Sequence, residues 1–162
     1  SRVGPDGNPP GGWQPQERLT REFDLDKEEK LTRAVKLANE GMELAKTAPK
    51  PWFYAQATDE QWAGAKADFV GEGYEAIGMA AVARKKYDDA AAAFKQSGET
   101  SNNPDAKNRA KLRLAQAYNM AGKFDEALSV LEPMLADQQL NPAFRQFAGQ
   151  EKLKAVTGKA KK

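Results

Sequence analysis

The chain has 162 residues, with 25 basic and 23 acidic side chains, and its length corresponds to one domain of ordinary size. It contains no cysteine and no histidine, which excludes disulfides, thiolate and imidazole metal ligands, cysteine nucleophiles and the Ser-His-Asp triad. Alanine occurs 28 times, whereas valine, isoleucine and threonine together occur 13 times, so the composition favours helices over sheets. We therefore predict an all-α protein that is not an enzyme and has no catalytic residue, metal site or cofactor.

The first part of the chain is rich in glycine and proline. Residues 1–16 contain four of each, a composition that cannot form a helix or fill a core, and we predict a flexible linker over residues 1–22. The first helix is expected to begin at Asp24 or Asp26, either of which can cap it. Pro49 and Pro51 end it. The aromatic triplet at residues 52–54 is either an exposed binding patch or part of a core, and we expect the core.

Five further helices follow from the caps and the apolar periodicity. A capping box at Thr58 and Gln61 opens the second helix, and an Asn141-Pro142 pair opens the last. The predicted ranges are 58–84, 88–97, 105–121, from Phe124 or Asp125 to 136, and 142–157, followed by a frayed basic tail at 158–162. The paired acids at the helix starts are explained by the helix dipole, so they do not indicate a catalytic carboxylate pair.

Two segments of the chain are similar to each other. Residues 86–90 read KYDDA and residues 123–127 read KFDEA, an offset of 37 residues. Small residues at equivalent positions, Gly78 with Ala115 and Ala90 with Ala127, allow neighbouring helices to approach closely. The pattern therefore predicts a repeated helix–turn–helix unit.

These segments resemble the tetratricopeptide repeat family. The positions that match are Tyr74, Ile77, Gly78, Tyr87, Ala90 and Phe94 in the first copy, and Leu114, Ala115, Tyr118, Gly122, Phe124 and Ala127 in the second. The resemblance implies an array of antiparallel helical hairpins in a right-handed superhelix of about six helices, over residues 23–157. The repeats would span about 71–104 and 108–141, with a capping helix at 142–157.

The resemblance also implies a function in protein interaction, with a protein or acidic peptide bound in a concave groove. The positions expected to line this groove are Glu72, Glu75, Met79 and Val82 in the first copy and Arg109, Leu112, Arg113, Gln116 and Asn119 in the second. In relatives that bind a peptide carboxylate, the basic pair corresponds to Arg109 and Arg113. Because cations are disfavoured at a helix N-terminus, we expect alanine at both positions to leave the fold intact.

Two other functions are also compatible with the sequence. The basic residues of helix 105–121 and of the C-terminal tail are typical of a phosphate-binding surface, although the net charge of only +2 argues against a nucleic-acid ligand. The other alternative is a structural module that forms homo-oligomers through exposed ends of the stack. Residues 1–81 carry 14 acidic and 10 basic side chains, and residues 82–162 carry 9 acidic and 15 basic ones. This difference in charge either favours head-to-tail packing of copies or reflects two solvated surfaces that differ in charge.

The location of the protein is predicted from two features. No apolar run reaches transmembrane length, so we expect no membrane insertion of this segment. The chain begins at Ser1 rather than at methionine. We expect a processed or truncated product, and we favour an exported or periplasmic protein, whose leader or anchor is removed before Ser1, over a cytoplasmic one.

Overall fold

A computed structural model describes residues 15–162, with side chains from residue 24 onward. This part of the chain contains α-helices and one short 3-10 helix, and no strand. The elements are α1 (Pro15–Thr47), η1 (Trp52–Tyr54), α2 (Asp59–Ala83), α3 (Tyr87–Thr100), α4 (Pro104–Met120), α5 (Phe124–Ala136) and α6 (Pro142–Ala160). The structure divides into two units within α1, between Arg33 and Ala34. All contacts described below belong to the second unit.

The two ends of the helical region extend further than the sequence predicts. Helix α1 begins at Pro15 rather than at Asp24 or Asp26, so the linker prediction is wrong for residues 15–22, and residues 1–14 lie outside the described part. Proline is tolerated in the first turn of a helix, and residues 16–23 contain no further proline or glycine. Helix α6 continues to Ala160, into the predicted tail, and within this extension Lys159 Nζ bonds to Asp125 Oδ1 at 2.6 Å.

The internal helix boundaries agree with the predicted ones to within a few residues. At the start of α2, Thr58 Oγ1 accepts a hydrogen bond from Gln61 N at 3.1 Å, and Thr58 N donates to Gln61 Oε1 at 2.8 Å. This is the predicted capping box. Asn103 and Asn141 cap α4 and α6 through their side-chain oxygens, each followed by a proline in the first turn.

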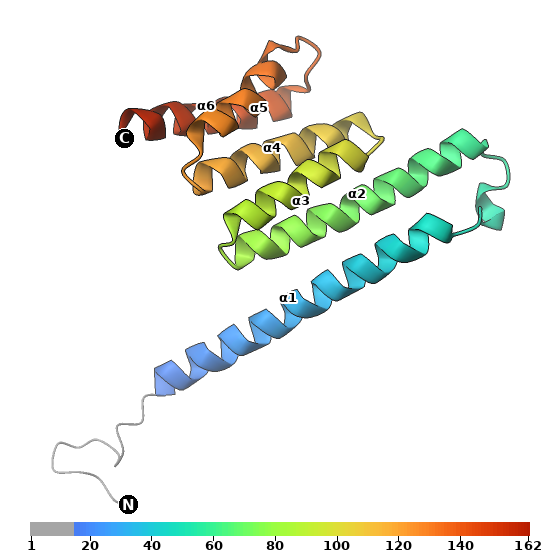
Figure 1. Ribbon diagram of the computed structural model, residues 1–162, viewed down its shortest axis with the longest axis horizontal. Coiled ribbons are helices and arrows are strands. Elements are labelled where there is room, and N and C mark those ends of the chain that lie inside the picture. Colours follow the sequence, from blue (N-terminus) through green and yellow to red (C-terminus); the bar gives the residue numbers. More distant parts are fainter. Residues whose placement is uncertain (1–14) are drawn as a thin grey trace, which may run out of the picture. The chain divides into compact units, whose positions relative to one another are not determined.

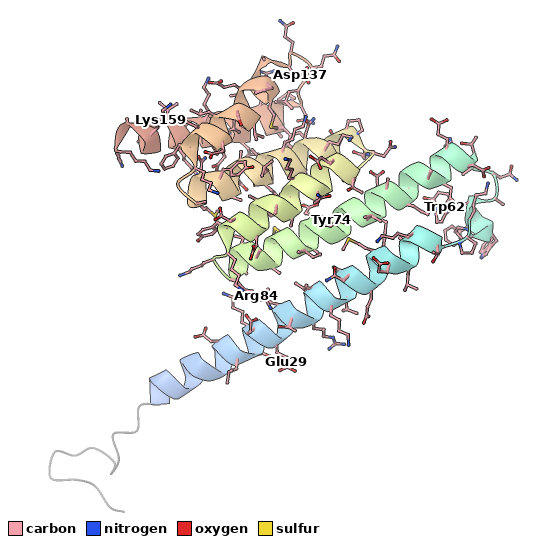
Figure 2. All side chains as sticks on the ribbon, in the orientation of Figure 1. Glu29, Trp62, Tyr74, Arg84, Asp137 and Lys159 are labelled. Atoms are coloured by element: carbon pink, nitrogen blue, oxygen red, sulfur yellow. The ribbon has the colours of Figure 1, made fainter. Side chains whose placement is uncertain are left out.

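The five helices α2 to α6 form an array in which each helix packs against the next in the chain (Figure 1). Helix α4 also packs against both α2 and α6, so it lies at the centre of the array. Trp62 on α2 and Lys159 on α6 mark the first and the last helix of these five (Figure 2). The molecule is thus an all-α helical repeat array, as predicted.

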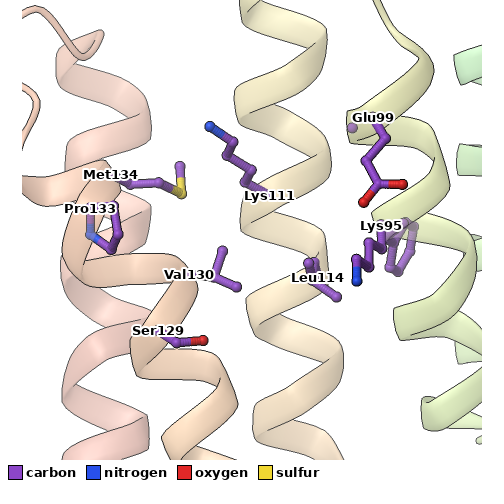
Figure 3. Close-up of a pocket in the computed structure, with 10 residues that line it drawn as sticks. Lys95, Glu99, Lys111, Leu114, Ser129, Val130, Pro133 and Met134 are labelled. Atoms are coloured by element: carbon purple, nitrogen blue, oxygen red, sulfur yellow. The ribbon is translucent and has the colours of Figure 1, made fainter.

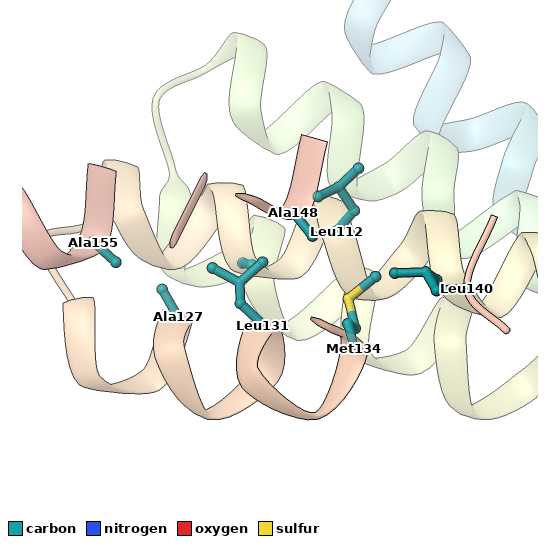
Figure 4. Close-up of a cluster of buried hydrophobic side chains, with 8 residues drawn as sticks. Leu112, Ala127, Leu131, Met134, Leu140, Ala148 and Ala155 are labelled. Carbon is teal, nitrogen blue, oxygen red and sulfur yellow. The ribbon is translucent and has the colours of Figure 1, made fainter. Parts of the chain in front are cut away.

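The helices approach one another closely at small residues. A Cβ atom added at Gly78 would lie 2.5 Å from the ring of Phe94, which is itself buried in α3. Ala90, Ala115 and Ala127 are completely buried. Figure 4 shows the larger of two core clusters, formed by residues of α4, α5 and α6 and the loop between the last two. Its buried members are Leu112, Ala115, Ala127, Leu131, Met134, Leu140, Ala148 and Ala155.

The aromatic triplet does not close a core, contrary to our expectation. Trp52 is 87% exposed and Phe53 is 66% exposed. Along η1 the rings of Trp52 and Phe53 meet edge to face and those of Phe53 and Tyr54 are tilted against each other, and the ring centroid of Tyr54 lies 5.2 Å from that of Trp62 on α2. A three-residue turn is too short to bury all three side chains against α2.

Candidate partner-binding surface

One face of α4 carries a stripe of partly exposed side chains. Arg109, Arg113, Gln116 and Met120 follow the spacing that places residues on one side of a helix. The side chains of the two arginines are 40% and 31% exposed, and Met120 is 52% exposed. Methionine adapts its shape to different apolar partners, and arginine binds carboxylates, so these residue types suit a protein-binding surface.

The carboxylate of Glu75 on α2 lies between the two arginines of the stripe. Arg109 donates from Nε and from Nη2, the latter to Glu75 Oε2 at 2.8 Å. Arg113 Nε donates to Glu75 Oε1 at 2.8 Å, and its Nη1 lies 2.9 Å from the sulfur of Met79. The structure therefore joins four of the predicted groove residues in one cluster, with a net charge of +1.

This cluster changes the acid strength of its members. Burial alone would raise the pKa of Glu75, but the hydrogen bonds and charges of Arg109 and Arg113 outweigh it and hold this pKa below its ordinary value. The Glu75 hydrogen bond in turn raises the pKa of Arg109, despite partial burial. Glu75 and Arg109 are therefore both charged at neutral pH.

Two of the predicted groove residues face a neighbouring helix instead of an open surface. Leu112 is buried in the core cluster between α4 and α6, so its assignment to the groove was wrong. Asn119 Nδ2 donates to Glu151 Oε2 at 2.9 Å and to the Glu151 backbone oxygen at 3.0 Å. Glu151 is buried in α6, and its other oxygen accepts from Lys154 at 2.8 Å.

The repeat explains why Glu75 and Leu112 each contact another helix of the array. Leu112 follows Glu75 by the repeat offset of 37 residues, and both side chains point toward the next helix on the same side of the array. Glu75 makes an ion pair between α2 and α4, and Leu112 makes an apolar contact between α4 and α6. This equivalence could have identified Glu75 as the partner of the arginines. Leu112 of α4 contacts α6, so the equivalent residue of α2, Glu75, is expected to contact α4.

A hollow lies on another side of α4 from the stripe, between α3 and α5. It has a volume of about 410 Å³, with Leu114, Val130 and Met134 among its apolar residues and Lys95, Glu99 and Lys111 among its charged ones (Figure 3). None of the residues predicted to bind a partner lines it.

No helix within residues 15–162 combines the length and apolar character needed to cross a bilayer.

The comparisons with known proteins give one match. Residues 81–151 match the family model described as tetratricopeptide repeat. Neither the curated proteins nor the solved structures that were compared gave a match. The matched range contains the α4–α5 hairpin together with α3 and the first part of α6, and it includes the completely buried Ala90, Ala115 and Ala127. Residues 81–151 are therefore similar to the tetratricopeptide repeat family, whose members commonly mediate protein–protein interaction.

Proposed function

We propose that this chain is a non-enzymatic interaction module that binds an acidic, partly apolar peptide segment of a partner protein. The peptide lies across α2, α4 and α6, along the α4 stripe. One observation supports this proposal: the α4 stripe exposes the guanidinium groups of Arg109 and Arg113 beside the apolar side chain of Met120. Met79 on α2 and Phe147 on α6 add to it, with 46% and 50% of their surfaces exposed.

The ionic cluster sets the charge of the peptide. Glu75 accepts from Nε and Nη2 of Arg109 and from Nε of Arg113. One terminal nitrogen of each guanidinium, Nη1 of Arg109 and Nη2 of Arg113, has no such bond. These nitrogens and the net charge of +1 attract a carboxylate more weakly than two free arginines would. The apolar side chains then supply most of the affinity, because the ionic contact is partly solvated.

Two single substitutions of opposite expected effect test the proposal. A random peptide library is displayed and selected on the 162-residue chain, and the enriched peptides are then measured by fluorescence polarisation. We expect enriched peptides to combine acidic and apolar residues. Arg113→Gln should weaken their binding about tenfold, whereas Glu75→Gln should tighten it, because it releases both guanidinium groups.

A cluster with a purely structural role would change affinity in the same direction in both variants, and that result would contradict the proposed site. Lys95→Gln, in the hollow between α3 and α5, serves as the matched control, since it also removes one positive charge but lies away from the stripe. Duplex DNA is measured in parallel. Tight binding of DNA that falls steeply with salt would instead support a nucleic-acid ligand.

A further inference from the structure

Helix α6 has an apolar face that no described residue covers. Leu153 is 68% exposed and lies opposite the buried Ala148 and Ala155 in the helical register, and Val156, which is 49% exposed, lies beside Leu153 on the neighbouring side of the helix. Gly149 lies on the same exposed face, and a Cβ atom added there would meet no other atom within 4 Å. This face, formed by Gly149, Leu153 and Val156, is called the α6 outer face.

The repeat register shows what kind of contact this face is built for. Gly149 follows Ala115 by 34 residues, and Ala115 follows Gly78 by 37, so the three occupy equivalent positions. At Gly78 this position receives the ring of Phe94 from the second helix of the hairpin. At Ala115 it lies in one core cluster with Leu131, again from the second helix. Helix α6 thus resembles the first helix of a hairpin, and the described residues provide no second helix.

At the other end of the array, residues 15–162 provide no first helix to pair with α1. Helix α3 is the second helix of the α2–α3 hairpin and precedes α4. Helix α1, from Ala34 onward, precedes α2 in the same way and therefore has the place of a second helix. Its buried Met42 packs against α2, where a Cβ atom at Gly73 would lie 2.5 Å from Met42 Cγ. Leu37 and Leu44 remain 57% and 71% exposed. Helix α3, by contrast, is packed by both α2 and α4.

An apolar pocket of about 410 Å³ lies between the exposed Leu44 and α2. Its lining residues are Gly41, Leu44, Ala45, Ala48, Tyr54, Trp62, Ala65, Lys66 and Phe69. Phe69 on its rim is 51% exposed. This pocket and the exposed leucines of α1 together form a surface, called the α1–α2 face, that can accept the apolar side of another helix.

The charges of the two ends are opposite. Residues 142–162, which contain α6, carry six basic side chains and one acidic one. Residues 34–81, which contain the α1–α2 face, carry seven acidic and four basic side chains. Opposite charge attracts the two ends of different copies and disfavours contact between identical ends.

We propose that copies of this chain associate head to tail, with the α6 outer face of one copy packed against the α1–α2 face of the next. Helix α6 of one copy and α1 of the other then complete a hairpin, in which an apolar side chain of α1 covers Gly149. The contact is heterologous, so each pair keeps one free end of each kind and the assembly can continue. It uses faces other than the α4 stripe and is therefore independent of the proposed peptide site.

The test uses one variant at each end. The tail variant carries Leu153→Asp with Val156→Asp, and the head variant carries Leu37→Asp with Leu44→Asp. These side chains are about half exposed or more, so circular dichroism should show an unchanged helical spectrum. In sedimentation at about 10–200 µM, we expect the average mass of the wild-type chain to rise with concentration and to fall with added salt.

Mixing the variants gives the deciding result. Each variant alone should remain a monomer, whereas an equimolar mixture should form a dimer and nothing larger, because only one intact head and one intact tail remain. Met120→Asp, which adds a charge to an apolar side chain on α4, should associate like the wild-type chain. Gly149→Trp provides a second block that acts by its size and should also abolish association.

Four results would overturn the proposal. These are a wild-type chain that stays monomeric at every concentration, a head or tail variant that still associates with itself, a mixture that does not dimerise, and loss of association in Met120→Asp. The second of these would indicate a symmetric contact between identical ends.

Discussion

Single residues at the two hairpin turns show how the same backbone is made by different side chains. Lys85 and Gly122 are equivalent by the repeat offset, and both have positive φ, 59° and 73°. In each turn the next residue donates a backbone hydrogen bond back into the helix, Lys86 to Ala81 and Lys123 to Tyr118. Glycine adopts this conformation without steric cost, whereas lysine does not.

Exchanging glycine at these two turns should therefore have opposite effects on stability. We expect Lys85→Gly to raise the free energy of unfolding, and Gly122→Ala to lower it, each by about 1 kcal/mol. Urea denaturation of both variants beside the wild-type chain measures the two changes. If both variants lose stability, the conformation at residue 85 is not strained.

A second pair of glycines differs in the space around them. We expect Gly78→Ala to destabilise by about 1–3 kcal/mol, because the new methyl group overlaps the buried ring of Phe94. Gly149→Ala should stabilise by about 0.5–1 kcal/mol, because alanine favours the helix and meets open space. Thermal unfolding at low protein concentration measures both. Equal effects at the two sites would mean that α2 and α3 are not in close contact.

At the scale of the helices, ion pairs join neighbouring elements and make stability depend on pH. The pKa of Glu75 is lowered in the folded chain from its ordinary value of 4.5. Its contribution to stability is therefore present above that value and is lost as the pH falls through the lowered one. The difference in unfolding free energy between the wild-type chain and Glu75→Gln should be about 1–2 kcal/mol at neutral pH and should shrink below pH 4.5. A constant difference down to strongly acidic pH would show that another group is responsible.

The same cluster reverses the effect expected from the sequence for the arginines. Arginine near the start of a helix is disfavoured by the dipole, which predicted that alanine at Arg109 and Arg113 would leave the fold intact. In the structure their removal leaves the carboxylate of Glu75, whose side chain is only 15% exposed, without a partner. We expect the double alanine variant to be less stable than the wild-type chain by about 2–3 kcal/mol in urea.

This difference shows which part of the structure the sequence can predict. Caps such as Thr58 and Asn141 act within a few residues, and small residues such as Gly78 recur at the repeat offset, so the internal helix boundaries and these close contacts were predicted correctly. The partner of Arg109 lies 34 residues earlier in the chain, at Glu75. Contacts of this kind depend on the register between packed helices, which local periodicity does not determine. The buried bond between Asn119 and Glu151 escaped prediction for the same reason.

At the scale of the whole molecule, α4 is the element on which the others depend. It packs against α2, α3, α5 and α6, and it contributes buried residues to both core clusters. The loop before it is also fixed from a distance, because Asp68 Oδ1 on α2 accepts bonds from Asn102 N and Asn103 N at 2.7 and 2.8 Å. A repeat array of this kind is stabilised mainly by contacts between neighbouring helices. Helices with a neighbour on only one side should therefore open more often than α4.

Hydrogen exchange of the native chain tests this order directly. We expect backbone amides in the middle of α4 to exchange only through complete unfolding, and amides of residues 34–47 in α1 to exchange through local opening at a lower free energy. The reason is that α1 has most of one face exposed, including Leu37 and Leu44, whereas Ala110, Ala115 and Ala117 of α4 are almost completely buried. Mass spectrometry of peptic fragments after timed labelling resolves the two segments, and the measurement is made at low protein concentration so that association does not protect the ends.

The mutation Leu131→Ala, which opens a cavity beside α4, should speed the exchange of α4 and of α5 together, since both then report the same global unfolding. If α1 were protected as strongly as α4, the array would unfold as one unit, and the local opening of its ends would be excluded.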